Sequence, residues 1–206
     1  MNKNINLALI SASAYTSAQI IANVLSTKIT VLPFVHLSMD AGTIIYPLTF
    51  TLRDFVHKTC GKKNSRVVVI FAAVFSLIAF LFFWLAGKMQ PDPSWAFQND
   101  YQNILMPVFR ISVASVIAQV ISELTDTEIF SMVYRRLNDV SAVLASNFVA
   151  LIVDSFIFSF IAFYGSLPFK TVTSIIFANI LVKAVISLVS SPFIRMVPRT
   201  VGTEEI

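Results

Sequence analysis

The chain has 206 residues, of which 56% are hydrophobic and only 13% are charged. A water-soluble domain of this size needs far more polar surface, so the composition excludes that class and predicts a polytopic membrane protein. In such a protein the net charge of +4 marks cytoplasmic loops and does not indicate a nucleic-acid partner. Cys60 is the only cysteine, which excludes an intrachain disulfide and a cysteine metal cluster.

Six apolar stretches approach the length of about 20 helical residues that crosses a bilayer. In chain order they cover about residues 6–24, 42–57, 67–87, 104–124, 140–164 and 172–194. The first could pass for a signal peptide, but no clear small-residue cleavage site follows it, and a retained span is expected. The second is short and contains Pro47, and the fourth could continue as a helix toward Leu137. We therefore predict an all-α fold, a polytopic bundle of six transmembrane helices forming a single domain over residues 1–206.

The loops between these spans alternate in basic content. The segment TCGKKNSR is expected to be a loop between spans two and three, and it is rich in Lys and Arg. Further basic residues lie between spans four and five, after span six and before span one, whereas each alternate loop has a single lysine. This bias predicts that both termini are cytoplasmic. The longest outer loop, residues 88–103, has two prolines and no periodicity.

Polar side chains recur at helical spacing inside five of the six spans. Span four carries one face of residues three and four apart: Ser112, Ser115, Gln119, Ser122 and Asp126, with Glu123 on the same side and Arg110 on the far side. The other stripes are Asn147 and Asp154 in span five; Asn179, Lys183, Ser187 and Ser190 in span six; Ser11, Tyr15, Gln19 and Asn23 in span one; and Tyr46, Phe50, Arg53 and His57 in span two, with Asp54 beside Arg53. Span three has no stripe and is expected to face lipid or to support the others by packing.

A charge inside a span costs about 2.5–3.5 kcal/mol on insertion scales, so such residues usually face the protein interior or a wet cavity. Converging polar faces predict a cavity at membrane depth and hence a substrate path. Two structural alternatives stay open. Small polar residues often serve only helix packing, and Asp154 could simply neutralise Lys183.

Motifs for catalysis are absent from the sequence. It contains no G-x-x-x-x-G-K-[ST], no H-E-x-x-H and no G-x-S-x-G, and the acids Asp54 and Asp154 lack the Gly-x-Gly-Asp context of intramembrane aspartyl proteases. We therefore expect no enzyme activity, no cofactor and no metal, and recognition and translocation remain. The alternative is a non-transport membrane protein, an intramembrane enzyme or an assembly factor, whose polar residues are structural.

Three blocks of the sequence resemble the queuosine precursor transporter family, also called the VUT family of integral membrane proteins. They are YPLTFTLRDFVHKTCGKKNSRVVV (residues 46–69), FRISVASVIAQVISELTDTEIF (109–130) and ASNFVALIVDSFIFSFIAFYG (145–165), and the lysine in ILVKAVIS also matches. The positions that correspond to the family pattern are Asp54, Arg110, Ala114, Ser115, Asp126, Asp154 and Lys183. Arg53 and Glu123 depart from it, because the family usually has Thr and Gln there.

The resemblance implies uptake of a 7-deazaguanine base, either 7-cyano-7-deazaguanine or 7-aminomethyl-7-deazaguanine, which are precursors of a modified tRNA base. It also implies a bacterial inner-membrane protein whose fold resembles the six-helix substrate-binding subunits of vitamin uptake systems. The expected partners are the nucleobase and the lipid bilayer, and not nucleic acid. A homo-oligomer is left open, as is the coupling to a proton gradient, to downstream trapping or to an external ATPase.

The chemistry of such a base suggests roles for the predicted site residues. Its neighbouring N1–H and N2–H groups can both donate to one carboxylate, that of Asp154 or of an acid in span four. Gln119, Asn147 and Asn179 are candidates for the O6 and N3 edge, and one of the nineteen phenylalanines for stacking. Arg110 and Lys183 would keep neighbouring acids ionised or pair with them when the site is empty.

Overall fold

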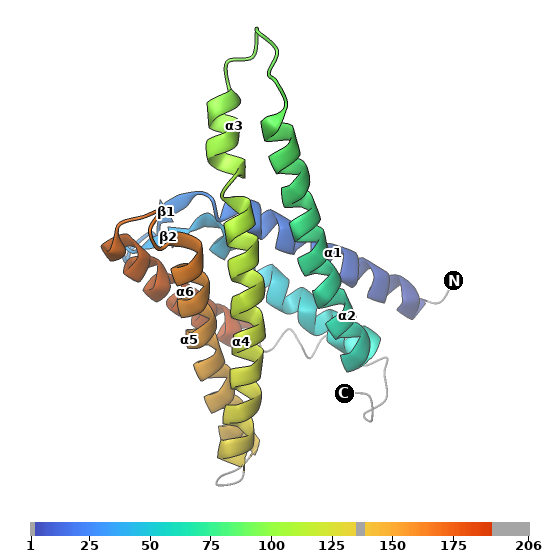
Figure 1. The fold of residues 1–206 in the computed structure, drawn as a ribbon. Helices are drawn as coiled ribbons and strands as arrows, with labels where there is room; N and C mark the ends of the chain where they lie inside the picture. Colours follow the sequence, from blue (N-terminus) through green and yellow to red (C-terminus); the bar gives the residue numbers. More distant parts are fainter. Residues whose placement is uncertain (1–2, 135–138, 191–206) are drawn as a thin grey trace. The chain divides into compact units, whose positions relative to one another are not determined.

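The computed structural model describes residues 3–134 and 139–190 (Figure 1). Its helices are α1 (Lys3–Leu25), α2 (Tyr46–Lys88), α3 (Gln98–Leu105), α4 (Val108–Tyr134), α5 (Asp139–Phe163) and α6 (Phe169–Ser190). Between α1 and α2 lie two short antiparallel strands, β1 (Ile29–Val31) and β2 (Ser38–Asp40), and the 3₁₀ turn η1 (Ala41–Ile44). The strands are an addition to the all-α prediction.

Among the described residues, five helical stretches are long and apolar enough to cross a membrane. They are Leu7–Leu25, Lys63–Lys88, Gln98–Ser122, Ala145–Phe163 and Phe169–Ile186. The prediction of a membrane helix bundle is therefore confirmed. The second predicted span, residues 42–57, corresponds to η1 and the first part of α2 and is not one of the five. The end of the sixth predicted span, residues 191–194, lies outside the described residues.

The basic segment between predicted spans two and three is helical, and the prediction of a loop there was wrong. Helix α2 is interrupted only at Gly61, where φ is 77° and ψ is 167°. This conformation is almost restricted to glycine because a Cβ would clash with the backbone. A single residue therefore redirects the chain, and Figure 1 shows the cyan first part and the green second part of α2 running in different directions.

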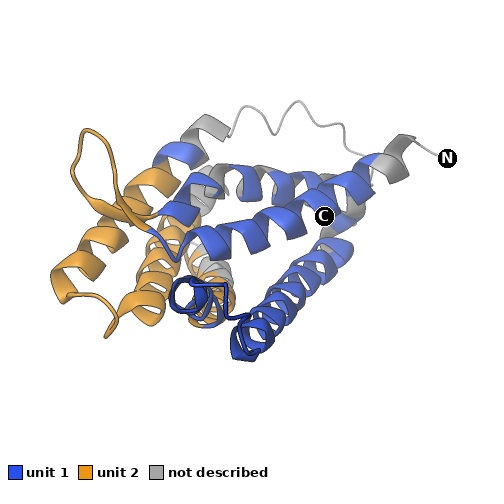
Figure 2. Ribbon diagram, turned by 90° about the horizontal axis from the view of Figure 1, so that it is seen from above, with its two compact units in different colours: residues 1–28, 41–109, 185–206 blue, residues 29–40, 110–184 orange. Residues whose placement is uncertain are grey.

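The chain forms two compact units, coloured separately in Figure 2. Unit 1 comprises residues 1–28, 41–109 and 185–206, and unit 2 comprises residues 29–40 and 110–184. In unit 1, Tyr15 from the polar stripe of span one packs with Val56 and Ala72 of α2. In unit 2, buried alanines and larger apolar residues of α4, α5 and α6 form the core: Ile111, Ala114, Ala118, Phe158, Ala162, Phe163, Val172 and Ile175. The single domain over residues 1–206 stays a prediction.

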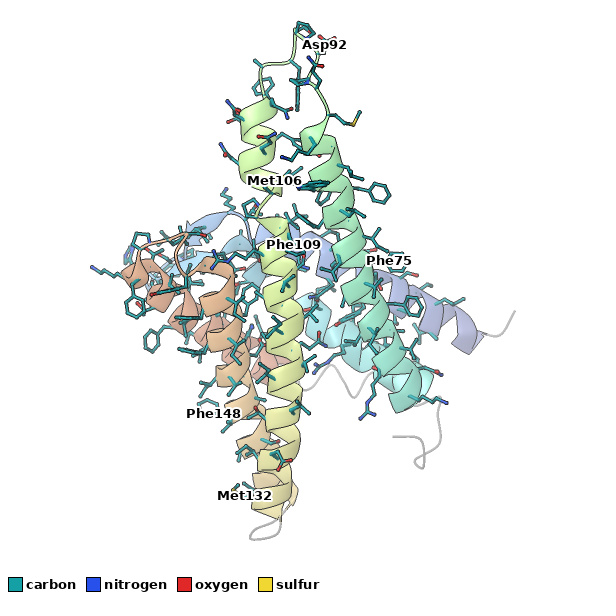
Figure 3. The ribbon with its side chains drawn as sticks, in the orientation of Figure 1. Phe75, Asp92, Met106, Phe109, Met132 and Phe148 are labelled. Carbon is teal, nitrogen blue, oxygen red and sulfur yellow. The ribbon has the colours of Figure 1, made fainter. Side chains whose placement is uncertain are left out.

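Large apolar side chains cover the outside of the long helices, as a lipid-facing surface requires. Phe75 of α2 and Phe148 of α5 are about half exposed and project outward from their helices (Figure 3). Only 11% of the most apolar stretch of Lys63–Lys88 is buried. This agrees with the expectation that span three faces lipid.

The long loop before α4 has more regular structure than its sequence suggested. Its second half forms α3, and the Nε2 groups of Gln98 and Gln102 both donate hydrogen bonds to the Gly87 carbonyl, at 2.8 and 2.7 Å. At the loop tip, the hydroxyl and the N–H of Ser94 both donate to Asp92 Oδ1, and these bonds lower the pKa of Asp92 below its ordinary value (Figure 3).

The conformation of Gly61 leads to the first prediction. Gly61→Ala should destabilise the protein by about 1–3 kcal/mol, because the new Cβ cannot occupy this backbone region without strain. The measurement is the Tm of the detergent-solubilised protein, with Lys63→Ala, an exposed position two residues away, as the control. An unchanged Tm for Gly61→Ala would contradict the bend.

Candidate functional site

An ion pair joins α5 and α6 inside unit 2. The Nζ of Lys183 lies 2.5 Å from Asp154 Oδ2. The lysine is 1% exposed, whereas the aspartate is 25% exposed. The same ammonium lies 5.9 Å from the ring centroid of the buried Phe158, one turn along α5 from Asp154. A desolvated ammonium thus meets a carboxylate on one side and an aromatic face on another, which offsets much of the cost of burying the charge.

A second polar link lies one turn away on the same pair of helices. Asn179 precedes Lys183 by four residues, so both side chains project from one face of α6. Its Nδ2 donates to Ser159 Oγ of α5 at 3.2 Å and to Asp40 Oδ2 of β2 at 3.1 Å. All three residues are fully buried. We call Asp40, Asp154, Ser159, Asn179 and Lys183 the polar seam.

The β1–β2 hairpin brings Asp40 to the polar seam. Ile29 pairs with Asp40 and Val31 with Ser38, and the turn between the strands contains Phe34 and His36 with positive φ. The Ser38 N–H donates to Ser174 Oγ of α6 at 2.7 Å, which fastens the hairpin to that helix (Figure 1). No local pattern predicts this placement of Asp40, because a lone acid in a short connecting segment usually faces solvent.

The polar seam combines acids, an amide and a hydroxyl within an apolar unit. Burying ionisable groups is costly unless they are paired and hydrogen-bonded, and each member of the seam has such a partner. The partial exposure of Asp154 leaves its carboxylate accessible while Lys183 holds one oxygen. Chemically, the seam can bind a ligand that offers hydrogen-bond donors to a carboxylate, and it contains no nucleophile–base arrangement among its described residues.

Arg110 has a different role in the structure, at the end of α5. Its Nε donates to the Ile161 carbonyl at 2.6 Å, one Nη donates to Ser166 Oγ at 2.7 Å, and the other donates to the Tyr164 carbonyl. The last carbonyls of a helix have no partner within the helix and carry partial negative charge. The guanidinium therefore caps α5 and its turn. A contact of Arg110 with substrate stays a prediction.

The remaining predicted site residues do not gather at the polar seam. Gln119 is half-buried on α4, and Asn147 is exposed on α5. The side chains of Asp54, Glu123 and Asp126 lie outside the part of the chain that the structure describes. The structure thus unites Asp154, Asn179 and Lys183 from the predicted set, and the substrate roles of all nine predicted residues stay predictions.

Asp40, Ser155, Ser159 and Phe158 were missed by the sequence reasoning. For the residues of α5 a signal existed, because Ser155 and Ser159 follow Asp154 at positions one and five, and serines four residues apart share a face of a helix. For Asp40 no local pattern existed.

The chain was compared with known protein families, curated proteins and solved structures. The family model described as "Putative vitamin uptake transporter" matches residues 40–197, most of the chain. A Bacillus subtilis protein named "Probable queuosine precursor transporter" is 25% identical over 176 residues, covering 82% of this chain and 76% of that protein. A Haemophilus influenzae protein of the same name is 26% identical over 125 residues, covering 61% of this chain and 52% of that protein. No solved structure matches the chain.

The ion pair gives the second prediction. Lys183→Met leaves the Asp154 charge without its cation and should destabilise the protein by about 3 kcal/mol, near the lower end for buried pairs because Asp154 is partly exposed. The double variant Asp154→Leu/Lys183→Met removes both charges and should lose less stability than Lys183→Met alone. Thermal unfolding of the single variants and the double variant measures this coupling, and strictly additive losses would contradict it.

The capping of α5 gives the third prediction. Arg110→Ala should lower stability by about 2 kcal/mol, because carbonyls at the end of α5 lose charge-assisted donors. Lys170→Ala, which removes an exposed charge at the start of α6, is the control and should leave the Tm within error. Equal Tm values for the two variants would show that the guanidinium contributes no net stability.

Proposed function

The chain belongs to the vitamin uptake transporter family, and we propose that this multi-pass membrane transporter takes up a queuosine precursor across the bacterial cytoplasmic membrane. The proposed substrate is a 7-deazaguanine base, 7-cyano-7-deazaguanine or 7-aminomethyl-7-deazaguanine. The names of the Bacillus subtilis and Haemophilus influenzae relatives support this substrate class. The family is one of transporters, which agrees with the expectation that the chain is not an enzyme and counts against the non-transport alternative.

The observation that carries the proposal is a partly exposed carboxylate fixed inside a membrane helix unit. Asp154 is oriented by Lys183 yet keeps a quarter of its side chain accessible. A 7-deazaguanine presents N1–H and N2–H side by side, and one carboxylate accepts both in a bidentate pair. Such a pair is strong where water is scarce, because both ligand donors would otherwise lose their hydrogen bonds on entering the site.

One aromatic ring beside the seam matches the flat face of such a base. Both Nδ2 hydrogens of Asn179 are already donated, to Asp40 and Ser159, so Asn179 holds the seam together and offers no further donor. Among the contacts described, Phe158 is the aromatic ring nearest to the Asp154–Lys183 pair. We assign Phe158 as the candidate for stacking. A fixed acid and a flat apolar surface would then together select a planar base with adjacent donors.

The wider proposal concerns orientation and assembly. Both termini lie in the cytoplasm, the two units act as one transmembrane domain, and the ligand is a small molecule and not a nucleic acid. The basic loops support the orientation.

Energy coupling is tested with a protonophore. Uptake that stops when the protonophore is added is coupled to the proton gradient, whereas uptake that is unaffected depends on downstream trapping or an external ATPase. A homo-oligomer is compatible with either.

Uptake by an Asp154 variant is the fourth prediction. Asp154→Asn retains size and an oxygen that accepts from Lys183, but its NH₂ group opposes the donor edge of the base, and uptake should fall by at least about tenfold. The measurement is uptake of radiolabelled base, or queuosine in tRNA, in cells that depend on salvage. Glu128→Gln, which neutralises an exposed acid on α4, is the matched control.

Protein level and Tm must accompany the uptake values, so that loss of folding is not mistaken for loss of binding. Wild-type uptake by Asp154→Asn at a normal protein level would remove Asp154 as a ligand. Binding is measured separately on purified protein, where 7-deazaguanine bases should raise the Tm of the wild type. A wild type that no guanine-like base stabilises would contradict the proposed substrate class.

A further inference from the structure

Ser155 of α5 is a fully buried hydroxyl whose Oγ has no hydrogen-bond partner among the described residues. Other helical hydroxyls of this chain donate back to the carbonyl four residues earlier, as Thr16, Thr59 and Thr125 do. Such a bond is the usual solution for a serine in an apolar helix. Ser155 does not use it, and a buried polar group that lacks a partner calls for a specific explanation.

The position of Ser155 points to that explanation. It is adjacent to Asp154, and it lies one turn before Ser159 on the same face of α5. Asp154 binds Lys183, and Ser159 binds Asn179, which is one turn before Lys183 on α6. The two links between the helices therefore bracket Ser155 along α5. Its hydroxyl therefore belongs to the segment of α5 that lies between the two linked positions.

We propose that Ser155 is a substrate-binding residue, which donates its Oγ–H to the O6 carbonyl of the base while Asp154 accepts N1–H and N2–H. This assignment rests on the proposed function. The edge of a 7-deazaguanine reads acceptor, donor, donor in that order, and a hydroxyl beside a carboxylate supplies the complementary set. A hydroxyl that is not committed to its own backbone is available for this bond.

In the present structure, the Lys183 ammonium donates to the carboxylate that the N1–H and N2–H groups of the base would bind. Its ammonium holds Asp154 Oδ2, and it is itself buried. Binding of the base would transfer that oxygen from the ammonium to the ligand donors, next to Ser155 in the sequence. The accessible quarter of Asp154 is where the base first makes contact. The exchange replaces one donor to the carboxylate by another, so the charge of Asp154 is never left without a donor.

The first arm of the test compares two buried serines. Ser155→Ala should raise the base concentration for half-maximal uptake by about five- to tenfold, which is the effect of one lost hydrogen bond. Its Tm without ligand should stay level or rise, because a hydroxyl without a partner is removed. Ser76→Ala is the matched control: Ser76 on α2 lies in the span without a polar stripe, is also buried, and its Oγ also lacks a partner among the described residues. It should leave uptake unchanged.

The second arm varies the ligand. The 6-thio analogue of 7-deazaguanine keeps N1–H and N2–H but offers a poorer acceptor at position 6. The wild type should bind it several-fold more weakly than 7-deazaguanine, and Ser155→Ala should bind the two compounds almost equally, as coupling between the hydroxyl and O6 requires. Ligand-induced Tm shifts on purified protein measure all four combinations.

The outcomes separate this inference from the proposed function. A wild type that binds 7-deazaguanine, with a Ser155→Ala variant that keeps the full discrimination against the 6-thio analogue, overturns the role of Ser155 alone. The role of Ser155 is also overturned if ligand-free Ser155→Ala has a lower Tm and loses uptake only through loss of folded protein, because the hydroxyl is then structural. A wild type that binds neither base overturns the proposed function and this inference with it.

Discussion

The contact of Lys183 with Asp154 across α5 and α6 organises unit 2. Apolar helices in lipid gain little from hiding apolar surface, since the lipid tails are apolar too, so close packing and polar bonds decide how they associate. The ion pair fixes the height of α6 against α5, and the bond from Asn179 to Ser159 one turn away fixes its rotation. Fully buried small residues, such as Ala178, let the backbones approach.

Under the proposed function, the same contacts supply the chemistry of the binding site. A charge at membrane depth is tolerated only with a partner. If a ligand can take over the bonds of that partner, the same charge can also bind the ligand. Asp154 has the needed features, because one oxygen is held and part of the side chain is accessible. A site that held its acid in a closed, fully buried network would be more stable but could not exchange partners.

The division between structural and ligand-facing polar groups follows from what each donor already binds. Arg110 gives its guanidinium donors to the carbonyls and the hydroxyl at the end of α5, which anchors α4 to α5 at that end. Asp40 reaches the polar seam on a hairpin and binds Asn179. Ser155 is different, since its hydroxyl has no partner among the described residues. The polar residues of unit 2 thus include both kinds.

Composition and periodicity alone determined the membrane class, the positions of five of the six predicted apolar spans and the faces that carry Asp154, Asn179 and Lys183. This is because span length and helical spacing are local properties of the chain. Only the tertiary structure decided that Gly61 interrupts α2 and redirects the chain, that Asp40 is buried against Asn179, and that Lys183 is the partner of Asp154. Spacing places a side chain on a face of its own helix, but the residue that it meets is set by the packing of segments distant in sequence.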